Sequence, residues 1–429
     1  MKAFHKMEGG DLEQIKEELL SLLCRYIRID TSNPPGETGE AVEFLKGLYE
    51  QEGIQYKVYE ASPAKKSIAA RIKSSGSTNK PLLLLNHMDV VPANKSHWNC
   101  EPFSGEIAQG YIHGRGALDM KGMAAAQIMS LFLINRKALK LNRDLIVLSV
   151  ADEETGGKLG AKFIVDNFFD EFNPEFVLDE GGFGFSTTNG RPVFFVSCSQ
   201  KKSLWLKIRA NGTAGHGSQP ISDNSNNILT HALSRLLSFK WPVEQDKSTR
   251  RLFNYLVHKD GAGLDLFNAL AANTVSITSL TSGTAVNVIP STAEATLDCR
   301  LLPNVKVEDV MRQISEVLAD SRIDIEVIKR TDKVVVSDFK SEFLDCIQGV
   351  LDFNFIRPRL VPFITPVGTD SKFFRDKGVR SYGLFPILIN SKELGSVHGA
   401  DERVSIDNLL LGTKIIYEVC ANYCTEIEF

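Results

Sequence analysis

Apolar residues recur along the first half of the chain with two different periods, which predicts helices and strands in alternation. Helical spacing runs through residues 12–28, where Asp11 is the expected N-cap, and again through 41–51. The expected strands that follow are 55–60, 67–72, 82–85, 145–150, 176–178 and 193–197, and the expected helices are 120–135 and 159–167. This order is typical of βαβ units, so we expect a mostly parallel sheet flanked by helices.

The pattern changes after residue 198. Three segments alternate apolar and polar residues as half-buried strands do, at 204–210, 274–280 and 293–300. Helices are expected beside them at 227–239 and 307–319, and a further strand at 323–328. They predict an α+β domain at 199–331, inserted into a first domain formed by 1–198 and 332–429. The returning segment carries expected helices at 337–350 and 406–420 and a strand at 380–384. Residues 241–273 show no sheet period and are interpreted as a helical excursion.

Composition narrows the functional classes. At 429 residues the chain is long enough for two or three domains, and its net charge of −4 provides no electrostatic footprint for nucleic acid or an anionic membrane. The N-terminus lacks a signal-peptide pattern and no apolar run approaches the ~20 residues that span a bilayer, so a cytoplasmic location is expected. The seven cysteines are odd in number and form no Cys-x-x-Cys pair, which favours free buried thiols.

Metal-binding residue types stand where buried strands end. His87 follows the leucine run at 82–85, Glu154 follows the strand at 145–150, and Glu180 follows the strand at 176–178; Asp119 lies between them in sequence. In open α/β sheets ligands bind at the carboxyl ends of the strands, so these side chains predict one shared site. With His398, two histidines and three carboxylates could hold two divalent cations, and one carboxylate would bridge them. Such a pair can activate a water and stabilise an oxyanion. On spacing alone, the assignment of His398 remains open.

The adjacent acids Glu153 and Glu154 require different roles, because successive side chains on a strand point to opposite sides. We assign Glu154 to metal and Glu153 to general base and then acid. Asp89, two residues after His87, is expected to hold the second imidazole nitrogen. The alternative for 152–154 is a capped turn that leads into the helix near Leu159, and a single acid at a strand end is more often a helix cap than a ligand.

Other catalytic schemes lack their motifs. The chain contains no Gly-x-Ser-x-Gly, no His-Glu-x-x-His, no Gly-x-x-x-x-Gly-Lys-Ser/Thr and no Gly-x-Gly-x-x-Gly. Serine hydrolase, single-zinc protease, nucleotidase and dehydrogenase interpretations therefore lose support.

Five segments together resemble one known family. They are His87-Met-Asp-Val-Val-Pro92, Gly114-Arg-Gly-Ala-Leu-Asp-Met-Lys-Gly122, Asp152-Glu-Glu-Thr-Gly-Gly157, Leu178-Asp-Glu-Gly-Gly182 and His398-Gly-Ala-Asp-Glu-Arg403. The chain is similar here to the co-catalytic zinc peptidases, which include aminoacylases, carnosinases, glutamate carboxypeptidases, acetylornithine deacetylases and succinyl-diaminopimelate desuccinylases. The resemblance extends from about Leu19 to the C-terminus.

The resemblance implies a role for each matching position. Asp119 would bridge two metal ions, His87 and Glu180 would complete one site, and Glu154 and His398 the other; Glu180 is preferred to Asp179 because it directly precedes glycine. Glu153 would be the general base. The inserted domain would be a lid and dimerisation domain, whose His216 reaches the substrate carbonyl, usually from the partner subunit. The implied substrate-binding residues are Asn287, Arg300, Gly368 and Thr369. Lys372 stands where relatives often have Arg, and Arg300 could instead pair with a neighbouring strand.

The expected reaction is hydrolysis of an amide bond next to a free carboxylate, in an N-acyl amino acid or short peptide, by a homodimer with two divalent metal ions. Zinc is the expected metal, with cobalt and manganese as alternatives. Within the class, a biosynthetic deacylase such as a desuccinylase or an acetylornithine deacetylase is the competing hypothesis. From another class, a catalytically silent, metal-stabilised binding protein competes.

Overall fold

The computed structural model describes residues 4–186, 190–242 and 264–425. These residues form two compact units. Unit 1 comprises Met1–Cys198, Ser337–Pro362 and Gly368–Phe429, and unit 2 comprises Ser199–Val336 and Phe363–Val367. Unit 2 thus includes residues 332–336 and 363–367, which the sequence pattern placed with the first domain. The two units are described separately.

Within the described residues, the central sheet of unit 1 has nine strands, in the order β1-β2-β6-β3-β7-β17-β9-β16 with β8 beside β9. The strands are β1 (Gln55–Ser62), β2 (Lys65–Ile72), β3 (Asn79–His87), β6 (Arg143–Val150), β7 (Phe176–Asp179), β8 (Gly184–Ser186), β9 (Pro192–Gln200), β16 (Arg359–Thr365) and β17 (Arg380–Gly383). The central strands β6, β3, β7 and β17 are parallel, whereas β1, β2 and β9 join antiparallel. The predicted, largely parallel α/β sheet is confirmed at its centre.

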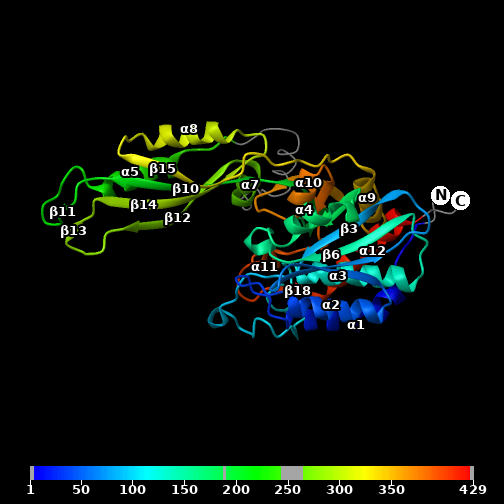
Figure 1. The fold of residues 1–429 in the computed structure, drawn as a ribbon. Coiled ribbons are helices and arrows are strands. Elements are labelled where there is room, and N and C mark those ends of the chain that lie inside the picture. Colours follow the sequence, from blue (N-terminus) through cyan, green and yellow to red (C-terminus); the bar gives the residue numbers. More distant parts are fainter. Residues whose placement is uncertain (1–3, 187–189, 243–263, 426–429) are drawn as a thin grey trace. The chain divides into compact units, whose positions relative to one another are not determined.

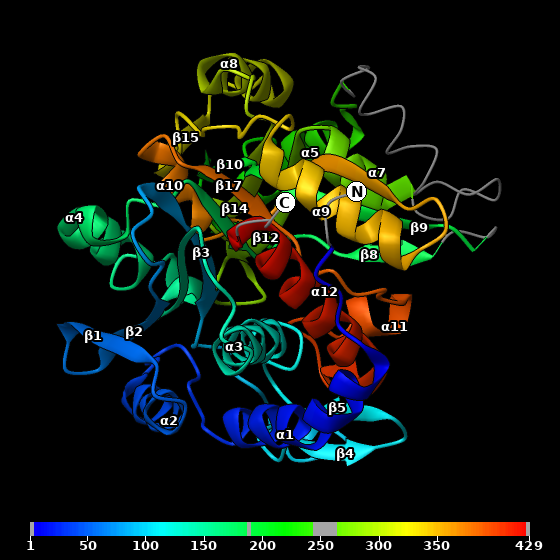
Figure 2. The same cartoon turned by 90° about the vertical axis from the view of Figure 1, so that its right-hand side faces the viewer.

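Helices cover both faces of this sheet (Figures 1 and 2). The helices of unit 1 are α1 (Gly9–Ile27), α2 (Gly39–Gln51), α3 (Lys121–Arg136), α4 (Ala161–Phe172), α9 (Glu342–Asn354), α10 (Ser371–Asp376), α11 (Ser391–Leu394) and α12 (Ile406–Cys424). On β3, Leu82 and Leu84 belong to the core formed with α3 and α12, whereas Leu83 and Leu85 belong to the core formed with α4. Burying each leucine contributes about 1.5–3 kcal/mol, which explains why the run is apolar without alternation.

Unit 1 also contains a small second sheet and two short 3-10 turns. A three-stranded sheet consists of β4 (Glu106–Ala108), β5 (Tyr111–His113) and β18 (Arg403–Ser405), and single 3-10 turns occur at η1 (Lys95–His97) and η2 (Glu153–Thr155). The pairing of β5 with β18 joins two segments far apart in the sequence, with Arg403 opposite His113.

Two helices begin at residues other than those predicted, because other residues cap them. Helix α1 is capped by Glu8, and Asp11, the expected N-cap, is instead the third helical residue, where its carboxylate accepts a hydrogen bond from the Glu8 amide. Helix α9 begins at Glu342 rather than near residue 337, because the Ser341 hydroxyl accepts the Leu344 amide at 3.3 Å.

Unit 2 contains a four-stranded antiparallel sheet in the order β12-β14-β10-β15. Its elements are β10 (Lys202–Asn211), β11 (Gly215–His216), α5 (Ser225–Ser238), α7 (Leu264–Ala271), β12 (Thr274–Ser282), β13 (Val288–Ile289), β14 (Thr292–Leu301), α8 (Val307–Leu318) and β15 (Ile323–Arg330). The apolar stripe of α8 packs with α5 onto alternate residues of β10 and β14. Part of the helical excursion expected at 241–273 is α7, and residues 243–263 lie outside the described residues.

Two further observations concern the helices and the cysteines. Among the described residues, every helix falls short of the length and apolar character needed to cross a bilayer. All seven cysteines are free thiols; Cys100 and Cys346 are partly exposed and the other five are buried.

Candidate metal centre

The carboxyl edge of the parallel strands in unit 1 collects the predicted metal-binding side chains. His87 is the last residue of β3, Glu180 directly follows β7, and Glu154 lies in η2 after β6. Because β3 pairs with β6 on one side and with β7 on the other, these three strand ends are neighbours. Asp119 precedes α3 and His398 lies in the loop before β18.

Asp119 lies between the two histidines. Its Oδ1 is 3.0 Å from His87 Nε2, and its Oδ2 is 2.9 Å from His398 Nε2. Each carboxylate oxygen therefore faces one imidazole, which is the arrangement required of a carboxylate shared by two cations.

The two other carboxylates each face one histidine. Glu180 Oε1 is 3.5 Å from His87 Nε2, and Glu154 Oε2 is 3.5 Å from His398 Nε2. Ligand atoms about 2.1 Å from a tetrahedral zinc ion lie roughly 3.4 Å from one another, so these spacings fit a common ion on each side of Asp119. The possible ligand atoms of His87, Asp119 and Glu154 all lie within 4.8 Å of one another, as do those of His87, Glu153 and Glu180.

The electrostatics of this cluster also fit cations. Burial opposes a charged His87, but hydrogen bonds with Asp119 and Glu180 outweigh it and raise the histidine's pKa well above its ordinary value. Hydrogen bonds with Asp119 and Glu154 raise the pKa of His398 to about 10, and burial together with the Asp119 charge raises the pKa of Glu180 to about 8. The buried Glu154 Oε1 has no hydrogen-bond partner among the described residues. A cation bound here would stabilise the charged forms of Glu154 and Glu180 and would replace the protons that the two histidines otherwise hold.

The orientation of His87 is set by its other nitrogen. Nδ1 lies 2.8 Å from the main-chain carbonyl oxygen of Asp89, whereas the Asp89 carboxylate is 3.8 Å away. We expected the side chain of Asp89 to hold this nitrogen, but the main-chain carbonyl of Asp89 holds it instead. A carbonyl can only accept, so Nδ1 carries a hydrogen, and Nε2 is the nitrogen that could bind a metal ion once it has given up its own proton.

The Asp89 carboxylate instead holds the turn that carries the two glutamates. Its oxygens accept the main-chain amides of Glu153 at 3.1 Å and Glu154 at 3.2 Å. These glutamates are in the 3-10 turn η2, not on an extended strand, because Asp152 adopts a left-handed φ of 71°. The expected alternation of these two side chains across a strand was therefore wrong, because they lie on a turn. The pKa of Glu153 is raised well above its ordinary value, first by burial.

The loop at residues 368–372 lies beside these turns. The side chain of Thr369 lies next to Gly181, and Lys372 Nζ donates to the main-chain oxygen of Gly156 at 3.3 Å. Gly368 precedes Thr369 in the same loop. Asp370, which was given no role from the sequence, is buried, and neither of its carboxylate oxygens has a hydrogen-bond partner among the described residues; burial raises its pKa to about 8. Its position directly after Gly368 and Thr369, which the family resemblance had singled out, was a sequence signal that could have identified it.

The remaining predicted residues belong to unit 2, which brings only some of them together. His216 on β11 pairs with Val288 on β13, directly after Asn287, whose main-chain oxygen accepts the Gly217 amide at 2.7 Å. Strand β14 begins at Thr292, shortly after β13 in the chain, whereas Arg300 lies near the other end of β14. At ~3.3 Å per residue, Arg300 is roughly 25 Å along the strand from Thr292. Both Asp298 oxygens accept hydrogen bonds from the Arg300 guanidinium, at 2.8 and 3.0 Å, so this side chain is already paired within its strand.

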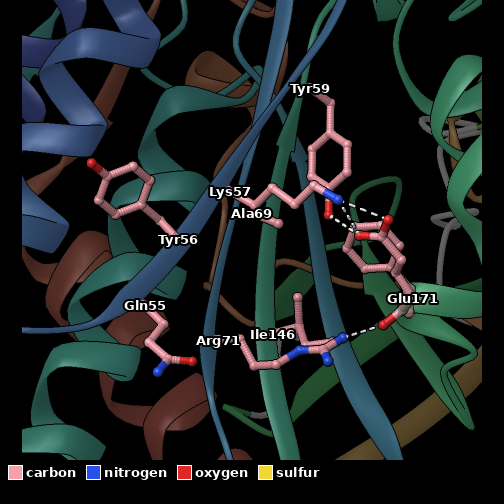
Figure 3. A pocket seen from close by; sticks show the side chains of 9 residues that line it. Gln55, Tyr56, Lys57, Tyr59, Ala69, Arg71, Ile146 and Glu171 are labelled. Atoms are coloured by element: carbon pink, nitrogen blue, oxygen red, sulfur yellow. Dashed lines mark hydrogen bonds and ion pairs between the residues drawn. The ribbon is translucent and has the colours of Figure 1, made fainter.

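A separate hollow in unit 1 is lined by residues of β1, β2 and the end of α4 (Figure 3). Lys57 and Arg71 point toward Glu171 in this view. Lys57 Nζ is 2.8 Å from Glu171 Oε1, and Arg71 donates to the Glu171 main-chain oxygen. Because Lys57 and Arg71 already have acceptors on Glu171, neither positively charged side chain is left to bind a ligand in this hollow.

An α/β sheet whose carboxyl edge places two histidines around a shared aspartate, with further carboxylates beside them, defines an enzyme of the metal-dependent amide hydrolase and peptidase class. Comparison with known families agrees, because residues 83–422 match Peptidase family M20/M25/M40. The chain belongs to this family.

Individual relatives support the assignment. The chain is 30% identical over 394 residues to N-fatty-acyl-amino acid synthase/hydrolase PM20D1 of Mus musculus, covering 85% of this chain and 78% of that protein. It is 29% identical over 402 residues to aminoacylase-1 of Sus scrofa, covering 92% of this chain and 93% of that protein. The crystal structure of an M20 family metallo-carboxypeptidase from Sulfolobus solfataricus matches with a TM-score of 0.73 and 19% identity, covering 95% of this chain and 99% of that one. The structural match shows the shared fold.

Proposed function

We propose that this protein hydrolyses the amide bond of N-acyl amino acids or short peptides next to a free carboxylate, with two divalent cations, zinc being the first candidate. The observation that carries the proposal is Asp119 between His87 and His398, at 3.0 and 2.9 Å. Two relatives, an N-fatty-acyl-amino acid synthase/hydrolase and an aminoacylase, support an acylated amino acid as substrate.

In this proposal the residues divide into two ligand sets that share Asp119. His87 and Glu180 would hold one cation, and Glu154 and His398 the other. When bound, the cations would polarise the scissile carbonyl and lower the pKa of a water. The hydrogen bond from His87 Nδ1 to the Asp89 carbonyl keeps Nε2 available for this role.

Glu153 is assigned the proton transfers. Its carboxylate takes a proton from the attacking water and delivers it to the leaving nitrogen, so that the C–N bond breaks to give a carboxylate and an amine. The raised pKa of Glu153, caused first by burial, supports this role. A carboxylate with a raised pKa takes up a proton more readily and can then pass it on.

Unit 2 is proposed as the lid and dimerisation domain. Its His216 would donate a hydrogen bond to the oxygen that becomes negative in the transition state, from the partner subunit of a homodimer. The exposure of this histidine on the β11–β13 ribbon supports such a role. Asn287 is proposed to contact substrate from the same ribbon, and Thr369 and Gly368 from unit 1. For Arg300, the substrate contact would require release from Asp298.

The test combines metal analysis with a substrate panel. Purified protein is depleted with a chelator, reloaded with Zn²⁺, Co²⁺ or Mn²⁺, and assayed on N-acetyl and N-fatty-acyl amino acids, dipeptides, and N-succinyl and N-acetyl diamino acids. We expect about two bound ions per chain and metal-dependent hydrolysis of the acyl amino acids. The methyl ester of the best substrate is the matched control, and it should react more slowly because it lacks the free carboxylate. Absence of metal binding, or equal rates for acid and ester, would contradict the proposal.

A further inference from the structure

We propose that Arg115 and Glu402 form a buried clamp that positions two of the proposed metal ligands, Asp119 and His398, relative to each other. The inference rests on the proposed function, because it assigns the clamp to the same metal centre. Neither residue was given a role by the sequence interpretation, although both stand inside motifs that carried the family resemblance.

Glu402 is fully buried and holds the segment that leads to Asp119. Its Oε1 accepts the main-chain amides of Leu118 at 2.8 Å and of Asp119 at 3.0 Å. Its Oε2 accepts the Gly116 amide at 3.1 Å and the Arg115 guanidinium at 2.6 Å. Four donors on one carboxylate leave the backbone of this segment little freedom, so the direction in which the Asp119 side chain leaves it is set.

Arg115 holds the other ligand loop. Its Nη2 donates to the main-chain oxygen of Gly399 at 2.9 Å and lies 3.4 Å from that of His398. This loop needs support, because His398 and Asp401 both adopt left-handed φ angles, of 58° and 55°, which L-residues disfavour. The planar guanidinium serves both partners at once: one nitrogen binds Glu402 and another binds the loop carbonyl.

The clamp joins segments from distant parts of the sequence, since Arg115 and Glu402 are 287 positions apart. Asp119 must face both histidines with separate oxygens, and a small shift of either loop would open one of those spacings. A buried ion pair contributes little net stability, because desolvation of the two charges offsets their attraction. Its effect is therefore expected in the geometry of the metal centre rather than in the free energy of unfolding.

The test measures metal binding and needs no turnover. Apparent Zn²⁺ affinities are obtained by competition with a chromophoric chelator, and the ligand field is obtained from the visible spectrum of the Co²⁺ form, for the full-length wild type, Glu402→Gln and Arg115→Lys. We expect Glu402→Gln to weaken Zn²⁺ binding by about 10- to 100-fold and to change the Co²⁺ spectrum, because an amide nitrogen would then face Arg115. Arg115→Lys should loosen mainly one of the two ions, the one assigned to His398.

Glu393→Gln is the matched control. Glu393 is also fully buried in the C-terminal segment, but its partners are Asn390, Ser405 and Asn408. This variant should bind metal as the wild type does. Equal losses in Glu393→Gln and Glu402→Gln would overturn the inference, because they would show a general effect of removing a buried acid.

The apolar double variant Arg115→Met/Glu402→Leu tests the clamp without leaving an unpaired buried charge. It removes the acceptor of the Gly116, Leu118 and Asp119 amides, so its Tm should fall, and it should bind Zn²⁺ at least 10-fold more weakly than the wild type. Wild-type affinity and an unchanged Co²⁺ spectrum in this variant would overturn the clamp while leaving the proposed function intact. Failure of the wild type itself to bind metal would overturn the proposed function and the clamp with it.

Discussion

At the scale of the residue, two neighbouring glutamates are distinguished by their surroundings. Glu154 lies 3.5 Å from His398, whereas Glu153 is half-buried and interacts with other charged groups that include His87 and Asp370. Asp89 holds both main-chain amides, so the turn presents the two carboxylates in fixed directions. The same residue type can thus serve as ligand and as base one position apart.

If Glu153 is the base and Glu154 a metal ligand, replacing each by glutamine should have different effects. Glu153→Gln should retain about two metal ions and lose roughly 10²- to 10⁴-fold in kcat, because the amide cannot accept the proton. Glu154→Gln should lose metal as well as activity, since an amide is a poorer ligand. Metal content by mass spectrometry and steady-state kinetics on the same preparations measure both. Normal turnover in Glu153→Gln would remove the base assignment.

At the scale of the element, the ligand-bearing strand ends depend on close backbone packing. A Cβ on Gly383, at the end of β17, would lie 1.9 Å from the main-chain oxygen of Glu180, which directly follows β7. Only glycine allows these parallel strands to approach so closely at the carboxyl edge. A side chain here would have to displace the backbone that carries Glu180.

We therefore expect Gly383→Ala to lower the free energy of unfolding by about 1–3 kcal/mol and to weaken metal binding. Gly349→Ala is the control, because Gly349 lies in the exposed face of α9 and a Cβ there meets no atom within 4 Å. This second change should raise stability by about 0.5–1 kcal/mol and leave metal binding unchanged. Urea unfolding and zinc titration distinguish the two. Wild-type zinc affinity in Gly383→Ala would contradict the role assigned to this packing.

At the scale of the whole molecule, the proposed catalytic groups are divided between two units. Unit 1 alone contains the acids and histidines of the metal centre, whereas His216 and Asn287 are on a two-stranded ribbon of unit 2. Catalysis across subunits of a homodimer would bring these sets together and would make assembly a condition of activity.

Complementation tests this arrangement. His216→Ala should lower kcat more than it changes KM, because the proposed hydrogen bond strengthens in the transition state. Co-refolding or subunit exchange between His216→Ala and Glu153→Gln should restore up to roughly a quarter of wild-type activity, because one kind of mixed site contains both native residues. His231→Ala on α5 is a histidine control expected to retain activity. No recovery in demonstrably mixed dimers would contradict catalysis by the partner's His216.

Part of this organisation could be predicted from the chain alone. Continuous apolar runs such as 82–85 indicate strands buried on both faces, and residues directly after them must lie at the carboxyl edge if the strands are parallel. That reasoning placed His87, Glu154 and Glu180 near one another. It could not place Glu153 relative to Glu154, because the left-handed turn at Asp152 depends on contacts with Asp89 and Lys65, which are remote in sequence.

The sequence by itself determined the mostly parallel sheet, the inserted α+β segment and the residue types of the metal centre, because hydrophobic period and local motifs are properties of short stretches. Tertiary structure decided that Asp119 faces His398 across a long sequence separation and that Glu402 and Arg115 connect their loops. These are contacts between side chains on different elements, and their geometry arises only when the elements pack.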